Sequence, residues 1–345
     1  MATIKEIAKR ANVSIGTVDR VLHNRGRVSK ETEKQVRRII AQVGYKPNVF
    51  AQQLRRSKKK YTFGILMPKP SQDSKYWQLP IRGMNKAQEE LNAHGVKLHY
   101  FFYDKYSESS FGNIGETVLN EKNDGLLIAP VISDIFHNFV KKIPKSIPYI
   151  FFDSFIPNSN YISYIGQDPF QSGILSGKLM HMLVGEEGSV VIVKFLPRDF
   201  HIEDRANGFQ AYIREHTNLN VHTYEVDTHE SMKVCKQVTN KIFNDIKNIK
   251  GIFVTNANTH QIASCVKTRN PSKKIFIIGY DLVEDNIKYL NEGIIDFLIS
   301  QMSEIQGYEG INFLYRYVVL REHVIKQKMM QIDIITKENL NYYKS

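Results

Sequence analysis

The chain has 345 residues, of which 42% are hydrophobic and 24% are charged, an ordinary composition for a globular protein of two or three domains. Its longest apolar runs, such as residues 125–130 and 275–278, have the length of a β-strand and are far too short to span a membrane. The formal net charge is +12, and all of it lies in the first 60 residues, where 16 Lys and Arg accompany 4 acidic side chains. This basic module favours nucleic acid as its partner, with an acidic membrane surface as the alternative.

The start of the basic module predicts a short helix followed by a tight turn. Apolar residues recur there at the spacing of one helical face, at Ile4, Ile7, Ala8 and Ala11. Thr3 and Glu6 have the spacing of a capping box, which would fix the start of this helix. Asn12 follows, and asparagine tolerates the left-handed backbone that suits a turn between helices.

Two more helices follow this turn. Ser14 is an N-cap candidate for a second helix whose buried face is Val18, Val21 and Leu22. A third helix is expected from near Ser29 to Gly44, before Pro47, burying Val36, Ile39, Ile40 and Val43. Two short helices joined by a turn of about four residues form a helix-turn-helix pattern, which binds DNA. A three-helix bundle whose charges are only solvated is the alternative.

The exposed start of the second helix favours DNA binding. Ile15, Gly16 and Thr17, with Arg20 one turn further on, form a small tip that can enter a major groove and reach a base edge. Residues 13–24, 28–29, 44–48 and 51–54 resemble the LacI/GalR family of bacterial repressors, and the resemblance continues over essentially the whole chain. It implies that Ile15, Gly16 and Arg20 read the major groove while Leu54 wedges into the minor groove. The predicted DNA-binding residues are Thr3, Ser14, Ile15, Gly16, Thr17, Arg20, His23, Asn24, Ser29, Asn48, Ala51, Gln52, Leu54 and Arg55.

Residues 49–60 are expected to form a hinge helix and linker after the DNA-binding domain, residues 1–48. Five of the six residues 55–60 are cationic, and such a run is usually a solvated tether. Beside a Leu that intercalates and kinks DNA, the preferred interpretation is a segment that becomes ordered on DNA.

Two positions depart from the family pattern. Asn12 stands where the family usually has Gly, which the turn can accept. Asp19 replaces the usual Ser and puts a negative charge on the face that approaches phosphates. Asp19 either orients Arg20 or Arg25, or accepts a hydrogen bond from a cytosine amine, or is an exposed acid that slightly lowers affinity.

From Thr62 onward, short apolar strands alternate with helical stretches. This alternation predicts an α/β fold of parallel sheets covered on both faces, and ten strands favour two lobes over one open sheet. Ligands of such sheets bind beyond the carboxyl ends of the strands, so two facing lobes make a cleft. Residues 112–115 indicate only a weak turn. The expected strands are 62–67, 98–103, 125–129, 149–152, 162–165, 189–193, 221–226, 251–255, 275–280 and 295–299, and the clearest helices are 81–92, 173–183, 204–215 and 232–246.

Polar side chains at strand ends predict a ligand site. Asp153, Asn256 and Asp281 each lie at or just past an apolar run. Carboxylates and amides in this position can bind the hydroxyls of a sugar, and Trp77, which follows Tyr76 after the first strand, can stack on its apolar face. A helix N-cap explains any single Asp better, but several polar residues in the same topological place favour a ligand.

This region resembles the sugar-binding core of the same family, which is close to ribose-type periplasmic binding proteins. Residues 165–168 and 298–301 resemble crossings between lobes, and 204–209 resemble the family's Arg-x-x-Gly-Phe helix start. The predicted effector contacts are Tyr76, Trp77, Asp153, Arg205, Asn256, Asp281 and Gln301. The implied core, residues 61–345, has an N-lobe of about 61–164 plus 302–325 and a C-lobe of about 165–301 plus 326–345. A homodimer with a contribution from residues 76–92 is also implied.

These features favour a transcription regulator, by resemblance a repressor, that binds a pseudo-palindromic DNA operator and is controlled by a sugar or sugar derivative. Four aromatic residues keep a purine or nucleoside co-repressor open: Tyr76, Phe102, Phe155 and Phe195. A transport or chemoreceptor sugar-binding protein is the rival, but residues 1–10 have no apolar signal core. With Cys235 and Cys265 interpreted as reduced thiols, a cytoplasmic, nucleoid-associated protein is expected. No Ser-His-Asp spacing, metal motif or cofactor fingerprint is present, so the sequence predicts no catalytic residue, metal or cofactor, and no enzyme.

Overall fold

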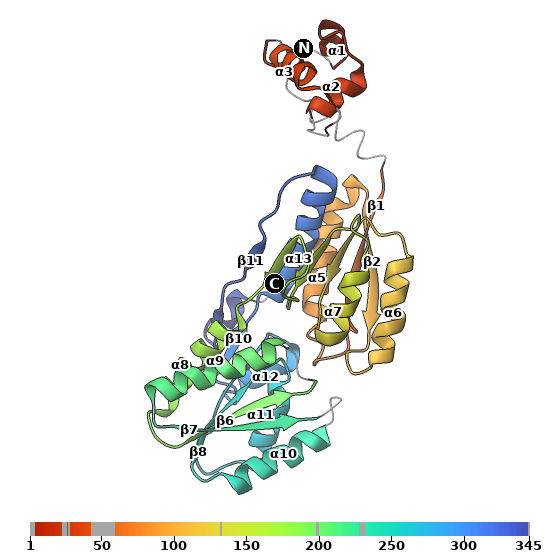
Figure 1. The fold of residues 1–345 in the computed structure, drawn as a ribbon. Coiled ribbons are helices and arrows are strands. Elements are labelled where there is room, and N and C mark those ends of the chain that lie inside the picture. The colour runs from red at the N-terminus through yellow and green to blue at the C-terminus, as the bar shows by residue number, and fades with distance from the viewer. Residues whose placement is uncertain are drawn as a thin grey trace. The chain divides into compact units, whose positions relative to one another are not determined.

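The computed structural model describes residues 4–22, 26, 28–42, 59–131, 133–197, 200–227 and 232–343 (Figure 1). The chain divides into a small unit, Met1–Lys59, and a large unit, Lys60–Ser345. The predicted hinge helix and most of the linker, residues 49–58, lie outside the described residues. None of the described helices is long and apolar enough to cross a membrane.

The small unit contains the three predicted helices, α1 (Ile4–Arg10), α2 (Ile15–Leu22) and α3 (Lys30–Gln42). Asn12 has the expected left-handed backbone, with φ of 50°. The Oγ of Ser14 accepts a hydrogen bond of 3.1 Å from the backbone N–H of Thr17, which confirms Ser14 as the cap of α2. The helices enclose one small apolar core, made of Ile7, Ala8, Ala11, Val18, Val21 and Val36.

The first lobe of the large unit is built on a six-stranded parallel sheet of order β11-β5-β4-β3-β1-β2. Helices α5 and α13 pack on one face of this sheet, and α6 and α7 pack on the other (Figure 1). The strands are β1 (Tyr61–Pro68), β2 (Val96–Tyr103), β3 (Gly125–Ile128), β4 (Tyr149–Phe152), β5 (Ser163–Gly166) and β11 (Gln327–Met329). The helices are α5 (Gln78–Leu91), η1 (Asn92–His94), α6 (Glu108–Asn120), α7 (Ser133–Lys142), α13 (Ser303–Leu314) and the π-helical η2 (Tyr315–Leu320).

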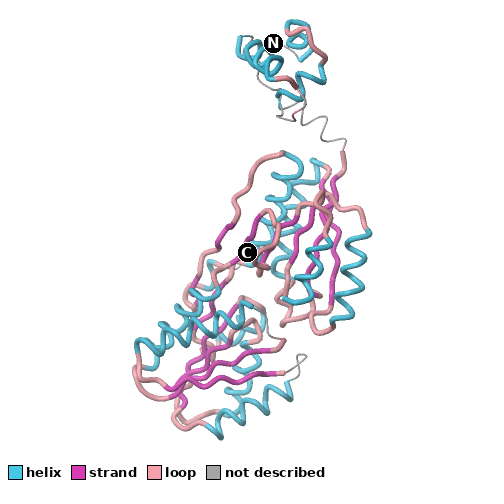
Figure 2. Tube along the Cα trace, viewed as in Figure 1, coloured by secondary structure: helices cyan, strands magenta, loops and turns pink. Residues whose placement is uncertain are grey.

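The second lobe repeats this arrangement with the order β12-β10-β9-β8-β6-β7, in which only β12 is antiparallel to its neighbour. Helices α8 and α9 pack on one face, and α10, α11 and α12 on the other, so each sheet is a middle layer between helices (Figure 2). The strands are β6 (Ser189–Phe195), β7 (Asn220–Val226), β8 (Ile249–Val254), β9 (Phe276–Tyr280), β10 (Phe297–Ser300) and β12 (Asp333–Ile335). The helices are α8 (Pro169–Val184), α9 (Phe200–His216), α10 (Met232–Asp245), α11 (Thr259–Arg269), α12 (Glu284–Asn291) and η3 (Leu340–Tyr342).

The structure contains all ten predicted strands and corrects two details. The turn predicted at residues 112–115 is wrong, because Gly112 and Gly115 lie inside α6. A Cβ on Gly115 would lie 3.2 Å from the Phe139 ring of α7, so this glycine permits close helix packing rather than a turn. The strands β11 and β12 were missed because they are three residues long and carry no extended apolar pattern.

Three chain segments cross between the lobes, and one side chain joins them. The Nε2 of Gln167, in the first crossing, donates hydrogen bonds to Ser300 O in the second crossing (2.9 Å) and to Gln331 O in the third (2.8 Å). The C-lobe was expected to resume at residue 326, but β11 pairs with β5 of the first sheet. The third crossing therefore follows Met329, since β11 completes the first sheet before the chain leaves it.

Helices α8 and α9 pack closely through glycine, which gives the Arg-x-x-Gly spacing a physical reason. A Cβ on Gly208 would lie 2.1 Å from Phe170 O, and a Cβ on Gly173 would lie 2.2 Å from Arg205 O.

Both obstacles are backbone atoms, so Gly208→Ala is expected to lower the free energy of unfolding by about 1–3 kcal/mol. Urea denaturation followed by Trp77 fluorescence measures this. The control is Gly112→Ala on the exposed side of α6, where no atom lies within 4 Å of the new Cβ. It should stabilise by about 0.5–1 kcal/mol, and an unchanged Gly208→Ala protein would contradict the close approach.

Candidate functional site

The start of α2 presents the predicted groove-reading residues to solvent. The Ile15 side chain is 49% exposed, which is unusual for a large apolar residue, and Gly16 and Arg20 are exposed as well. Ser14 and Thr17 contact each other through their hydroxyl oxygens at 2.9 Å and frame this tip. Ser29 caps α3 through a 3.2 Å hydrogen bond from the Thr32 N–H. The remaining predicted DNA contacts lie outside the described residues, namely Thr3, His23, Asn24, Asn48, Ala51, Gln52, Leu54 and Arg55.

The second predicted site is a cavity of about 30 Å³ in the large unit. Its walls come from the loop after β1, the ends of β2 and β4, helix α9, and the ends of β8, β9 and β10. All seven residues predicted to contact an effector line it: Tyr76, Trp77, Asp153, Arg205, Asn256, Asp281 and Gln301. Five lining residues were not predicted: Asp73, Lys105, His201, Ile202 and Ala257.

Two of the missed residues had a signal in the sequence. Lys105 follows the apolar run of β2 by two residues, the same strand-end position that selected Asp153. His201 precedes Arg205 by four residues, so the two share one face of α9. Of the aromatic residues that kept a purine ligand open, Tyr76 lines the cavity and Phe102, Phe155 and Phe195 do not.

Equivalent aspartates of the two lobes have the same strained backbone. Asp153 follows β4 with φ of 66°, and Asp281 follows β9 with φ of 68°. Their N–H groups still bond to the neighbouring strand, at Ile165 O (3.1 Å) and Ile299 O (3.0 Å), before each chain turns away. Left-handed non-glycine residues cluster at binding sites, where the surrounding structure holds them in place.

Arg205 organises the wall that the second lobe contributes. Its Nη1 donates to Thr255 O at 2.9 Å, its Nη2 donates to Gln301 Oε1, and its guanidinium lies 4.0 Å from the centre of the Tyr280 ring. Gln301 extends this network, because its Nε2 donates to Asp281 Oδ2 at 2.9 Å. Arg205 is only 2% exposed, so this network is formed almost entirely away from water.

Aromatic and charged side chains form the opposite wall. The Tyr76 hydroxyl donates to Asp153 Oδ1 and accepts a 3.1 Å hydrogen bond from Ser303. Trp77 donates from Nε1 to Asp73 Oδ2 at 2.8 Å, and its ring meets that of Tyr76 edge-on with centroids 5.0 Å apart. Lys105 donates to the other oxygen of Asp73. Asp73 therefore holds both the indole and the ammonium in place.

Polar contacts also join the lobes beside the cavity. The Ser74 hydroxyl, from the loop after β1, donates to Asn258 Oδ1 and lies 3.5 Å from His260 Nε2. The Nδ1 of His260 lies 3.3 Å from Asn286 Oδ1. Asn286 in turn donates to the carbonyl groups at the ends of β8 and β9, at Ala257, Tyr280 and Asp281. The structure thus shows the lobes in contact around a small cavity.

Burial shifts the pKa values of three side chains that line the cavity. It raises the pKa of Asp153 to about 6 and that of Asp281 to about 7, because removal from water penalises the charged carboxylate. The pKa of Asp153 is held down in part by the hydrogen bond from Tyr76, and that of Asp281 by the charge of Arg205. Burial and the charges of Arg205 and Lys105 lower the pKa of His201 well below its usual value, so this imidazole is neutral.

These pKa shifts predict a pH dependence of stability. A carboxyl group with a raised pKa binds a proton in the folded protein that the unfolded chain has released, so its contribution is fully present below about pH 4 and lost as pH rises through 6 and 7. The melting temperature of the ligand-free protein should fall relative to that of Asp281→Asn between pH 5 and 8. The exposed Glu116 of α6 provides the control, since Glu116→Gln should keep the wild-type profile. Parallel curves for wild type and Asp281→Asn would contradict the shift.

Among the described residues, no three His, Cys, Asp or Glu are grouped to hold a metal ion.

Two family models match this chain, one in its basic N-terminal part and one in its neutral core. Residues 3–48 match the model of bacterial regulatory proteins of the lacI family, and residues 63–322 match the periplasmic binding protein domain. The chain belongs to the lacI family of bacterial regulatory proteins. The predicted fold class, a helix-turn-helix domain followed by a two-lobed periplasmic-binding-protein-like core, is confirmed.

Individual relatives of this lacI-family regulator agree with both matches. It is 24% identical over 346 residues to the ribose operon repressor of Lactococcus lactis subsp. lactis, covering 97% of this chain and 96% of that one. It is 25% identical over 221 residues to a xylose/arabinose-binding protein of Sulfolobus acidocaldarius, covering 59% of this chain and 54% of that protein. A solved LacI transcriptional regulator from Bacteroides fragilis aligns with a TM-score of 0.76 and 28% identity, over 83% of this chain and 100% of that one. The relatives are regulators and sugar-binding proteins, not enzymes, and the chain is a DNA-binding regulator with a core of the sugar-binding type.

Proposed function

We propose that this regulator is a repressor whose affinity for a DNA operator is controlled by a sugar or sugar derivative bound in the cavity of the large unit. The observation that carries the proposal is the convergence of side chains from both lobes on one cavity. A ligand there contacts Asp153 of one lobe and Arg205 of the other, so its binding energy depends on how the lobes are arranged. The names of the relatives, a ribose operon repressor and a xylose/arabinose-binding protein, support a sugar as the ligand class.

The cavity described here is too small for a sugar. A volume of about 30 Å³ leaves room for roughly one water molecule, so a monosaccharide requires the lobes or the lining side chains to move apart. The contacts of Ser74 and Gln167 between the lobes would have to rearrange or rotate in that step. Such a change between two arrangements is what couples ligand binding to a distant function.

The proposed regulator acts as a cytoplasmic homodimer on a pseudo-palindromic operator. One short recognition helix per chain buries little DNA surface, and two-fold symmetry doubles its contacts. Helix α5 is the proposed contribution of the N-lobe to the dimer. Tyr76 and Trp77 precede it but are buried in the cavity wall, so the exposed residues of α5, such as Lys86 and Glu89, are the candidates.

The test has two stages. A thermal-shift screen of the full chain against monosaccharides, polyols and nucleosides identifies any ligand that raises the melting temperature. Operator affinity is then measured by gel shift with and without that ligand. We expect a change of about 5- to 150-fold, corresponding to a coupling of 1–3 kcal/mol. A ligand that binds but leaves operator affinity unchanged would rule out allosteric control, and stabilisation by nucleosides alone would rule out the sugar.

A further inference from the structure

Acidic groups outnumber basic groups in the cavity wall. Three carboxylates line it, Asp73, Asp153 and Asp281, together with two cations, Lys105 and Arg205. All five side chains belong to residues that are at most 7% exposed, so water screens these charges little. His201 is neutral because its pKa is lowered, and the wall carries one net negative charge when its carboxyl groups are ionised.

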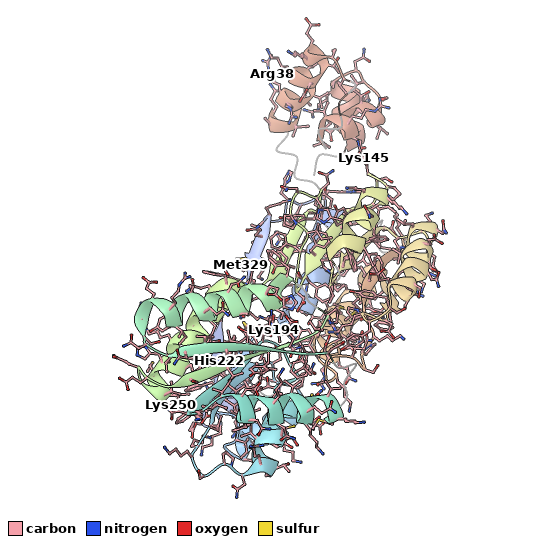
Figure 3. The ribbon with its side chains drawn as sticks, turned by 60° about the horizontal axis from the view of Figure 1, so that its bottom comes forward. Arg38, Lys145, Lys194, His222, Lys250 and Met329 are labelled. Atoms are coloured by element: carbon pink, nitrogen blue, oxygen red, sulfur yellow. The ribbon has the colours of Figure 1, made fainter. Side chains whose placement is uncertain are left out.

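The two cations of the wall are already engaged. Lys105 is bound to Asp73, and both Nη atoms of Arg205 donate to Thr255 and Gln301. Only Nε of Arg205 has no hydrogen-bond acceptor among the described residues. Each Nη atom keeps one further N–H, so Arg205 can still donate to a ligand, although two of its five donors are committed to Thr255 and Gln301. Another buried cation of the second lobe is Lys194, which is labelled in Figure 3. It is paired with Glu203 and Glu225 and does not line the cavity.

Asp153 is the acidic group of the wall with an unsatisfied oxygen. Its Oδ1 accepts a hydrogen bond from the neutral Tyr76, and its Oδ2 is buried without a hydrogen-bond partner among the described residues. The neutral imidazole of His201 lies beside it, with Nδ1 3.9 Å from Oδ2. Arg205 and Lys105 lower the pKa of Asp153 only through longer-range electrostatics, and burial outweighs them. A buried carboxylate oxygen without a donor is costly, so a bound ligand should supply one.

We propose that the effector is an amino sugar, whose protonated amine binds Asp153 Oδ2 beside the aromatic rings of Tyr76 and Trp77. This inference rests on the proposed function and specifies its ligand. An ammonium group balances the charge of the ionised Asp153 and gives its orphaned oxygen a hydrogen-bond donor. Tyr76 and Trp77 favour a cation through their ring electrons. Arg205 Nε donates to a hydroxyl or the ring oxygen of the same sugar, whereas an anionic sugar adds a further negative group to a wall that already holds three carboxylates.

Matched sugars test the charge directly. Isothermal titration of the full chain compares glucosamine with glucose and N-acetylglucosamine, galactosamine with galactose and N-acetylgalactosamine, and each with its uronic acid and 6-phosphate. We expect one amine to bind at least about tenfold more tightly than its parent sugar, and acetylation to remove the advantage because it removes the charge. Equal affinity for amine and parent sugar, or tighter binding of the acid or phosphate, would overturn the inference and leave the proposed function standing. Failure of every sugar to bind would count against both.

A variant pair locates the amine. Asp153→Asn keeps the shape of the side chain and removes its charge, so the preference for amine over parent sugar should shrink at least about tenfold, with a smaller change for the parent sugar. Asp285→Asn, which removes an exposed carboxylate near His260 outside the cavity, should keep the preference. An unchanged preference in Asp153→Asn would exclude Asp153 as the amine site. The comparison of acetylated and free amines in the wild-type protein remains decisive if the variant does not fold.

Discussion

Arg205→Lys is expected to abolish the effector response while leaving operator binding without effector intact. Lysine has no planar fork, so it cannot donate to Thr255 O and Gln301 Oε1 together while stacking on Tyr280. A hydrogen bond from a charged donor contributes about 1.5–3 kcal/mol, so misplacing this donor should lower effector affinity by about 10- to 150-fold. Isothermal titration gives the effector affinity, and gel shift gives the operator affinity.

The control for this variant lies on the same helix. Arg214→Lys makes the same substitution at an exposed position of α9, nine residues further along, and should leave effector affinity within about twofold. Retention of effector affinity by Arg205→Lys would mean that the cavity is not the effector site. Because Gly173 packs against the backbone carbonyl of Arg205, circular dichroism should first confirm that α8 and α9 remain folded in the variant.

Arg20→Ala is expected to weaken operator binding and to relax its sequence preference at one base pair of each half-site. An Arg that binds a base edge contributes about 1–3 kcal/mol of discrimination, roughly 5- to 150-fold per contact, and a homodimer makes the contact twice. Titration of the operator and of single-base variants by gel shift measures both effects. Exposure of Arg20 beside Ile15 and Gly16 on α2 supports this role.

Arg37→Ala separates base reading from simple charge. Arg37 is exposed on α3 and paired with Glu33 at 2.7 Å, so its removal takes the same charge from another helix of the small unit. We expect a smaller loss that is uniform across sequences. If Arg20→Ala also loses affinity uniformly, with a shallower dependence on salt, then Arg20 contacts a phosphate rather than a base.

Local chemistry explains how much could be predicted from the sequence. The cap at Ser14, the start of the third helix near Ser29 and the left-handed turn at Asn12 depend on residues close in the chain, and local sequence was sufficient to predict them. Most of the predicted strands were recognisable because helices bury them on both faces, whereas the edge strands β2 and β7 are only partly buried. Strand-end residues such as Asp153 and Asp281 could be grouped because parallel strands bring their carboxyl ends to one edge of a sheet.

Features that depend on distant pairing were out of reach. The short strands β11 and β12 exist because β5 and β10 offer free edges, and three residues carry no periodic signal of their own. The third crossing was placed a few residues too early for the same reason. The glycines of α6 were misinterpreted as a turn because the neighbour that requires Gly115, the Phe139 ring, lies on another helix.

The sequence by itself determined how this protein is divided into a DNA-binding part and a ligand-binding core. It placed a basic helix-turn-helix module before a neutral two-lobed core, because charge and periodicity are local properties. Strand ends selected Asp153, Asn256 and Asp281, and the family resemblance added Arg205 and Gln301; all five line one cavity. Only the tertiary structure decided which of these groups are satisfied. The pairing of Lys105 with Asp73, the commitment of Arg205 to Gln301 and the orphaned oxygen of Asp153 join residues 32 to 96 positions apart or depend on their burial. Hydrogen bonding and desolvation depend on three-dimensional contacts. They determine which polar groups of the cavity remain for a ligand and therefore which kind of ligand the cavity favours.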